Sequence, residues 1–230
     1  MKIITAGNIS KDIAVSLTDM GFEVCYTCED ANLLDGLKFH PDMQMSKIGS
    51  YVICNPDMYN HLKKILENTS YKLVCGKKQT RCNYPNDVAY NIKVAGENVF
   101  HNFKYTDDIL KEKLEHKNKI NVSQGYSGCS ICYIGDNALI TADTVIYSSA
   151  IQNGIDALLI SAGNIALPGF DYGFIGGASF YLDSTVYFFG NIQNHPEYAK
   201  INEFCTKHNT KLCSLSKEEL TDYGSAVTLD

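Results

Sequence analysis

The segments GSAVTLD (residues 224–230) and MKIITA (residues 1–6) decide the fold, because together they complete the fifth copy of a repeat. The copies begin at His40, Asn86, Cys129, Gly176 and Gly224, with spacings of 46, 43, 47 and 48 residues, and the spacing from Gly224 across the two ends to His40 is again 46. A repeat that keeps its period across both termini predicts a ring. We therefore expect residues 225–229 to pair with residues 1–6.

Each copy has the pattern of strand, turn, strand, helix and strand. First strands are expected at residues 43–48, 88–94, 130–134, 178–182 and 225–229, and second strands at 51–54, 98–105, 138–141, 185–189 and 1–6. Third strands are expected at 22–27, 71–75, 120–123, 157–161 and 211–215. Hairpin-type turns such as Asp136-Asn137 and helix-capping residues such as Asn55 and Asp143 separate these elements. The pattern predicts a five-fold pseudosymmetric α/β propeller of strand-strand-helix-strand modules; the alternative is an ordinary α/β sheet.

Composition narrows the class of protein. The chain has 230 residues, 45% of them hydrophobic, which is enough for a full core, and closure of the ring predicts a single domain over residues 1–230. Its net charge is −6. An acidic chain without clustered Lys and Arg is not expected to bind nucleic acid. The sequence shows neither a signal-peptide core nor a run of membrane-spanning length, so we expect a cytoplasmic protein that does not contact a membrane. The nine cysteines indicate reduced thiols, and the oligomeric state stays open.

Two Cys-x-x-Cys pairs, Cys25/Cys28 and Cys129/Cys132, have the spacing of a zinc site. Residues three apart on a strand point to opposite faces, whereas a zinc pair needs both sulfurs at one tight turn. We therefore predict no metal site and no cofactor.

The entrances of the first strands are expected to face the centre of the ring, and they carry the candidate site. The residues at these entrances are His40, Asn86 or Asp87, Cys129, Gly177 and Ser225. Because side chains alternate along a strand, His40 and Asp42 are predicted to share a face, where a carboxylate can orient an imidazole. A cysteine, a histidine and an aspartate are sufficient for nucleophilic attack on an sp2 carbon.

Three stretches resemble the pentein, or guanidine-modifying enzyme, superfamily: GLKFHPDM (residues 36–43), YPNDVAY (84–90) and YSGCSICYI (126–134). The first resembles the histidine-bearing strand of deiminases and of dimethylarginine dimethylaminohydrolase, the second resembles the copy that follows it, and the third resembles the nucleophile strand. The resemblance implies that Cys129 attacks, that His40 transfers protons and that Asp42 holds the imidazole. It also implies that Asn86, Asp87, Gly177 and Ser225 lie around the substrate.

Two departures from the superfamily pattern are expected to matter. The nucleophile strand ends the chain in those hydrolases, whereas two more copies follow it here, so this sequence resembles a circular permutation of them. Family members hold the guanidinium with carboxylates at strand entrances, and the matching positions here are 176–178 and 224–226, which carry none. We therefore expect arginine-like substrates to be poor and a neutral or anionic small molecule, or a partner surface, to be preferred, unless a loop residue such as Asp35 or Asp171 supplies an acid.

These observations leave two functions open. The first is a cysteine-dependent hydrolase or transferase that acts on a carbon–nitrogen bond of a small molecule. In that case a neighbouring imidazolium should lower the pKa of the Cys129 thiol and make it the most reactive cysteine. The second is a pentein-fold binding protein without catalysis, resembling the ribosome anti-association initiation factor. The cysteine and histidine favour the first, and the apparent lack of acids favours the second.

Overall fold

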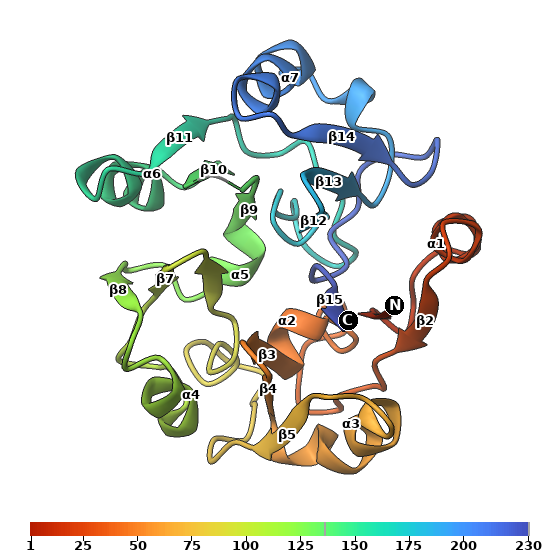
Figure 1. Ribbon diagram of the computed structural model, residues 1–230, viewed down its shortest axis with the longest axis vertical. Helices are drawn as coiled ribbons and strands as arrows, with labels where there is room; N and C mark the ends of the chain where they lie inside the picture. The colour runs from red at the N-terminus through yellow and green to blue at the C-terminus, as the bar shows by residue number, and fades with distance from the viewer. Residues whose placement is uncertain (136, 230) are drawn as a thin grey trace.

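The computed structural model describes residues 1–135 and 137–229, so Asp230 and the Asp136 member of the predicted turn lie outside the described residues. In this part of the chain, five three-stranded sheets lie around a common centre (Figure 1). Their strands are β15 (Val227–Leu229), β1 (Lys2–Thr5) and β2 (Glu23–Tyr26); β3 (Met45–Ile48), β4 (Tyr51–Cys54) and β5 (Lys72–Cys75); β6 (Lys93–Ala95), β7 (Asn98–His101) and β8 (Asn118–Asn121); β9 (Ile131–Tyr133), β10 (Ala138–Thr141) and β11 (Asp156–Leu159); β12 (Ser179–Leu182), β13 (Thr185–Phe188) and β14 (Lys211–Ser214). The protein is thus a mixed α/β structure.

Every sheet repeats one pairing rule. The middle strand is antiparallel to the strand before it and parallel to the strand after it. The parallel pair needs a crossover, and a helix supplies it in each module. These helices are α1 (Lys11–Asp19), α3 (Tyr59–Leu66), α4 (Asp108–Lys113), α6 (Thr144–Gln152) and α7 (Tyr198–Lys207), with 3-10 turns at Pro56–Met58 before α3 and Ile192–Asn194 before α7. The expected order of elements is confirmed.

Helix starts are fixed by side chains that accept backbone N–H groups. Ser10 caps α1, Asp107 caps α4 and Asp143 caps α6, while Asn55 and Asn191 cap the two 3-10 turns. Such caps satisfy N–H groups that have no partner inside the helix. The polar residues that recur after the second strands are therefore explained by local structure.

The two ends of the chain meet in one sheet. β1 pairs with β15 in antiparallel register, with Lys2 opposite Leu229 and Ile4 opposite Val227. Figure 1 shows both termini next to each other at this sheet. The predicted pairing of the terminal strands is confirmed.

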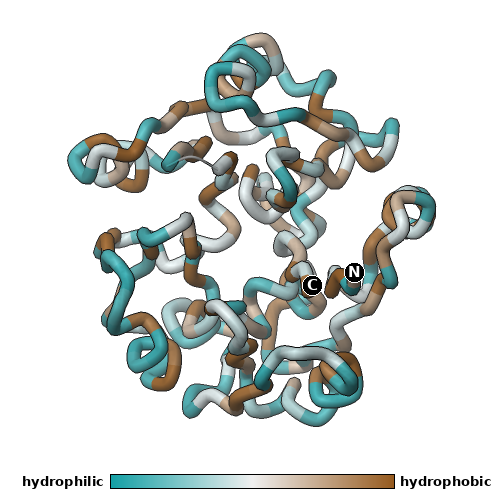
Figure 2. The backbone as a smooth tube through the Cα atoms, in the orientation of Figure 1, coloured by the Kyte–Doolittle hydropathy of each residue, from teal (hydrophilic) through white to brown (hydrophobic). Residues whose placement is uncertain are grey.

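Apolar side chains gather between neighbouring sheets. Among the described residues, five core clusters each join two adjacent modules, and one of them joins the last module to the first through Ile3 of β1 and Phe180 of β12. Figure 2 shows hydrophobic and hydrophilic stretches alternating along the strands and along the outer helices. Burial between modules therefore holds the sheets around the centre, since no single small sheet covers its own apolar surface.

Two first strands are each preceded by a one-turn helix that the sequence prediction missed. Residues Pro41–Gln44 form a one-turn helix, α2, ahead of β3, and Ser127–Ser130 form a second one, α5, ahead of β9. Pro41 favours this turn because its ring fixes φ at a helical value at the first helical position. The prediction that His40 and Asp42 share the face of a strand is therefore wrong.

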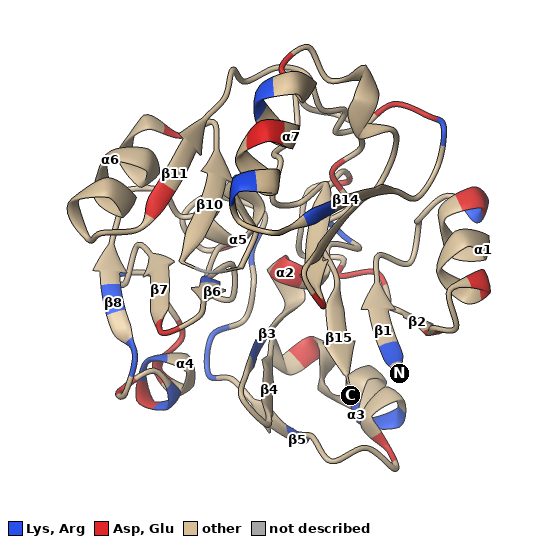
Figure 3. Ribbon diagram, turned by 45° about the horizontal axis from the view of Figure 1, so that its top comes forward, with Lys and Arg blue, Asp and Glu red and all other residues tan. Residues whose placement is uncertain are grey.

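Charged residues of both signs are interspersed over the surface shown in Figure 3, as on α4 and α7. Across residues 1–135 and 137–229, none of the helices combines the length and apolarity that crossing a membrane requires.

Candidate active site

His40 and Asp42 reach the centre from the start of α2. His40 is the N-cap residue of this helix, and Asp42 stands in its first turn. The backbone N–H of Asp42 donates to the carbonyl of Gly224 (3.2 Å), and a Cβ on Gly224 would stand 2.4 Å from the Cβ of His40. Gly224 is therefore required for the close approach of the terminal segment to α2. The imidazole is almost fully buried, with 2% of His40 exposed.

Cys129 enters from the one-turn helix α5, and Asn91 holds it. The Asn91 Oδ1 accepts from the backbone N–H groups of Gly128 (2.8 Å) and Cys129 (3.2 Å), while its Nδ2 donates to Cys129 Sγ (3.1 Å). Asn91 lies in the irregular segment before β6, which begins only at Lys93, and so is not part of a strand as the expected range 88–94 implied. The amide thus fixes both the backbone and the sulfur of Cys129.

Asp222 is a carboxylate at the centre that the sequence prediction missed. Its Oδ2 accepts from the N–H of Phe174 (2.9 Å) and its Oδ1 from the N–H of Gly224 (2.9 Å). A Cβ on Gly177 would stand 1.9 Å from Asp222 Oδ1, so this carboxylate occupies the space that any side chain at 177 would need. The prediction that the entrance of the fifth copy lacks an acid is therefore wrong. The signal was present in the sequence, because Asp222 stands two residues before Gly224, at which that copy was taken to begin.

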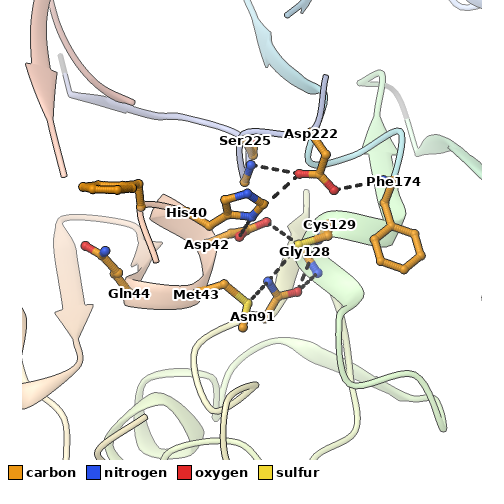
Figure 4. Close-up of polar contacts among 12 residues, drawn as sticks. His40, Asp42, Met43, Gln44, Asn91, Gly128, Cys129, Phe174, Asp222 and Ser225 are labelled. Carbon is orange, nitrogen blue, oxygen red and sulfur yellow. Dashed lines mark hydrogen bonds and ion pairs between the residues drawn. The ribbon is translucent and has the colours of Figure 1, made fainter. Parts of the chain in front are cut away.

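The four reactive side chains converge in one buried space (Figure 4). The Cys129 thiol donates to Asp42 Oδ2 (3.0 Å), and His40 Nδ1 lies 4.0 Å from Asp42 Oδ1 and 3.8 Å from Asp222 Oδ1. Within the described structure, His40 Nδ1 and Asp42 Oδ1 are buried atoms without a hydrogen-bond partner. Buried polar atoms are nearly always paired, so these two mark a place where a polar ligand fits.

Burial and mutual repulsion decide the protonation of this site. Burial and the carboxylates of Asp42 and Asp222 raise the pKa of the Cys129 thiol well above its usual value. Burial raises the pKa of the Asp42 carboxyl, and it raises that of Asp222 to about 6. The Cys129 thiol and the carboxyl groups of Asp42 and Asp222 therefore each disfavour their charged form. The predicted lowering of the Cys129 pKa is wrong, because two carboxylates and the lack of solvent outweigh a nearby imidazole.

The other predicted binding residues lie at different places. Asn86 is exposed, and the buried Asp87 accepts a hydrogen bond from the Tyr126 hydroxyl. Gly177 contributes only backbone atoms and space, since it has no side chain and accepts from the N–H of Ser225 (2.8 Å). The Ser225 hydroxyl donates to the carbonyl of Ser179 (2.8 Å), away from the thiol.

Of the two candidate loop acids, only one lies near the site. The Asp35 carboxylate is 97% exposed and pairs with Lys38, so it does not reach the centre. Asp171 lines a cavity that also contacts Cys129.

Three donor atoms in the site are close enough to hold a metal ion. Ligand atoms of His40, Asp42 and Cys129 lie within 4.8 Å of one another, and among the described residues they are the sole cluster of three such groups. Neither Cys-x-x-Cys pair belongs to a cluster of this kind. The effect of a chelator on activity therefore distinguishes a metal held by these three residues from a thiol nucleophile.

We expect Cys129 to be a slow thiol in the free protein. At pH 7.5, iodoacetamide should label the exposed Cys82 at least about tenfold faster than Cys129, which is 1% exposed and has a raised pKa. Asp42→Asn should speed the labelling of Cys129 about tenfold, because it removes a charge that opposes the thiolate. Peptide mapping over time measures both rates, with Cys82 as the internal reference. Equal labelling of the two cysteines in the wild-type protein would contradict this assignment.

Comparison with known proteins gives a family and a fold. A family model described as a family of unknown function (DUF6873) matches residues 4–227, and no curated protein matches the sequence. The structure of SxtG, an amidinotransferase in the saxitoxin biosynthetic pathway of Microseira wollei, is similar with a TM-score of 0.58 and 12% identity, covering 100% of this chain and 94% of that protein.

Two further solved structures agree. A dimethylarginine dimethylaminohydrolase adduct has a TM-score of 0.54 and 11% identity, covering 94% of this chain and 92% of that one. The inosamine-phosphate amidinotransferase StrB1 of Streptomyces griseus also has a TM-score of 0.54 and 11% identity, covering 95% of this chain and 78% of that one. The fold is that of the pentein superfamily, and the circular permutation stays a prediction. By its match over residues 4–227, the chain belongs to the family of unknown function DUF6873.

Proposed function

We propose that this protein is a cysteine-dependent enzyme that cleaves a carbon–nitrogen bond of a guanidinium compound. The observation that carries the proposal is the buried meeting of Cys129, His40, Asp42 and Asp222 around two unpaired polar atoms. A nucleophile, a proton carrier and two carboxylates in one space form the set that such a reaction needs. The earlier expectation of a neutral or anionic ligand depended on missing acids, and Asp222 removes that reason.

The two carboxylates suit a planar cation. A guanidinium presents several N–H donors in one plane, and it pairs best with carboxylates that accept two bonds each. Asp42 Oδ1 has no partner among the described residues, and Asp222 Oδ1 lies 3.8 Å from the imidazole. The positive charge of a bound guanidinium would therefore stabilise the ionised carboxylates of Asp42 and Asp222, whose burial otherwise disfavours ionisation.

Substrate binding would also activate the nucleophile. Cys129 is a thiol that donates to Asp42 Oδ2. A cation between Asp42 and Asp222 offsets their negative charge at the sulfur, and so lowers the pKa of the thiol. The thiol passes its proton by way of the Asp42 carboxylate to His40, and the thiolate then attacks the guanidinium carbon to form a carbon–sulfur bond.

The intermediate then collapses and is released. The carbon–nitrogen bond to one amine breaks, and that amine leaves with a proton delivered by His40. Neutral His40 next takes a proton from the second nucleophile, which attacks the same carbon and breaks the carbon–sulfur bond. Water as that nucleophile makes the enzyme a hydrolase, and a second amine makes it an amidinotransferase. The names of the similar structures, amidinotransferases and a dimethylarginine dimethylaminohydrolase, support both forms of this chemistry.

The test is turnover of a guanidine panel, with and without an acceptor amine. We expect Cys129→Ala to lower kcat/KM at least about a thousandfold, as loss of a nucleophile does. Cys132→Ala is the matched control, because Cys132 is equally buried and lies only three residues further along the chain. Mass spectrometry of the wild-type protein should find an amidino group on the peptide that contains Cys129.

Three outcomes would oppose the proposal. Full activity of Cys129→Ala would show that the thiol is not the nucleophile. Activity that a chelator abolishes and zinc restores would point to a metal held by His40, Asp42 and Cys129 instead. No turnover or covalent adduct with any compound would favour the binding protein without catalysis.

A further inference from the structure

A cavity with apolar walls opens onto the reactive thiol. It has a volume of about 270 Å³ and contacts both Cys129 and Asp222. These two residues are buried, whereas Phe170 and Tyr172 in the same lining are 40% and 42% exposed. The cavity therefore leads from solvent at Phe170 and Tyr172 down to the reacting sulfur.

The walls of this cavity are flat and hydrophobic. The Tyr126 and Phe174 rings stack at 6.5 Å with an angle of 23°, and Tyr172 meets Phe174 edge-on at 6.2 Å. Leu37 and Leu167 complete the lining, and both belong to a small buried apolar cluster. Aromatic walls of this kind stabilise apolar and aromatic groups through burial and ring contacts.

The charge of the lining is entirely negative. Among the described residues that line the cavity, the charged ones are Asp171 near the mouth and Asp222 at the floor, and neither Lys nor Arg is present. The sequence has a single arginine, Arg81, whose side chain donates to Gln79 in an exposed contact. A substrate carboxylate in this cavity would lose its hydration without gaining a cationic partner.

A second cavity next to the site differs in charge and position. It contains Lys47 and Lys93, and Asp42 lines it, but neither Cys129 nor Asp222 does. Each cavity is lined by one of the two carboxylates, the first by Asp222 and the second by Asp42, but of the two only the first contacts the sulfur. The cavity lined by Phe170 and Tyr172 is therefore the one that accommodates the substituent of a reacting guanidine.

We propose that this site selects guanidines with an apolar or aromatic substituent and excludes those that carry a carboxylate. This inference rests on the proposed function, and it adds the substrate class. The guanidinium lies between Asp42 and Asp222, and Asp171 repels a negative group near the mouth. The substituent packs against the rings that line the cavity, those of Tyr126, Phe170, Tyr172 and Phe174. Free arginine is thus a poor substrate because of its carboxylate, although its guanidinium fits.

Benzylguanidine and 4-(guanidinomethyl)benzoate form a matched pair, since they differ only in the carboxylate. We expect kcat/KM to be at least about tenfold higher for benzylguanidine, because the second compound must desolvate its charge without a partner. Asp171→Lys should raise the ratio of kcat/KM for the benzoate to that for benzylguanidine about tenfold, because it replaces a repulsive charge by an attractive one for the carboxylate. A preference of the wild-type protein for the benzoate would overturn the proposal.

The aromatic walls need their own test. The double variant Phe170→Ala and Tyr172→Ala should raise KM for benzylguanidine about tenfold and leave kcat nearly unchanged, because these rings hold the substituent and not the reacting carbon. Tyr26→Ala is the matched control, since Tyr26 is 43% exposed on the outer strand β2. An unchanged KM in the double variant would contradict a role for these rings.

Binding separates this inference from the proposed function. Calorimetry with Cys129→Ala, which cannot form the adduct, measures the affinity for each member of the pair without turnover. Tighter binding of benzylguanidine than of the benzoate supports the substrate class even if no compound is turned over. Tighter binding of the benzoate, or no binding of either compound, overturns it.

Discussion

Removal of residues 224–230 is expected to destabilise the protein by several kcal/mol and to make it insoluble or unfolded at 25 °C. The deletion removes β15, leaves one edge of β1 unpaired and takes Leu229 out of a core cluster that also holds Ile4 and Met45. Thermal and urea unfolding of the shortened chain, compared with the full chain, measures the loss.

Two point substitutions on β15 refine this test. Leu229→Ala should cost about 2 to 4 kcal/mol, because the side chain is 1% exposed and its removal leaves a cavity. Thr228→Ala, one residue away on the same strand, should cost well under about 1 kcal/mol. Melting of the shortened chain at the temperature of the full chain would show that the terminal pairing does not support the fold.

Asp222→Asn is expected to lower kcat/KM for guanidines at least about a hundredfold, since it removes one of the two charges that hold the cation. Asp183→Asn is the matched control, because Asp183 lies in the exposed turn between β12 and β13. Activity of Asp222→Asn within about threefold of the wild-type value would show that this carboxylate does not hold the cation.

The same substitution should change how stability depends on pH. The pKa of Asp222 rises from 3.8 to about 6 on folding, so the folded protein binds this proton more tightly. Protonated Asp222 therefore makes its full contribution to the free energy of unfolding below about pH 4. This contribution, about 3 kcal/mol, is lost as the pH rises through about 6. Asparagine does not titrate, so the stability of Asp222→Asn relative to wild type should improve by that amount between pH 4 and pH 8. The assignment would be contradicted if the free energies of unfolding of the two proteins, measured by urea at each pH, differed by the same amount across this range.

The order of elements was predictable because it depends on short-range patterns. Alternating strands, hairpin turns and helix caps such as Asn55 and Asp143 are local, and the repeat multiplied each signal five times. The pairing of β1 with β15 followed from the period alone. The proximity of Cys129, His40 and Asp42 was also predictable, since each lies at the start of a repeat.

The rest of the site depended on irregular backbone. Asp222 lies in a segment without a named strand or helix. Its carboxylate accepts from Phe174 and Gly224, and its own N–H donates to the carbonyl of Ala166 (2.9 Å); these bonds place it beside His40. Asn91 was hidden in an expected strand that begins two residues later than the asparagine. The raised pKa of Cys129 arises from burial and from charges distant in sequence, so residue spacing alone could not predict its sign.

The lack of a side chain at Gly177 decides whether the Asp222 carboxylate can occupy its place in this site. The space at the Cα of Gly177 belongs to one module, and the carboxylate of Asp222 that fills it belongs to the next. One added methyl group, as in Gly177→Ala, would displace the Asp222 carboxylate without changing Cys129, His40 or Asp42. Within a ring of similar modules, the number of acids around the thiol can thus be changed from two to one by a residue that has no side chain of its own. A search for related sites should therefore look for a glycine opposite the acid as well as for the acid itself.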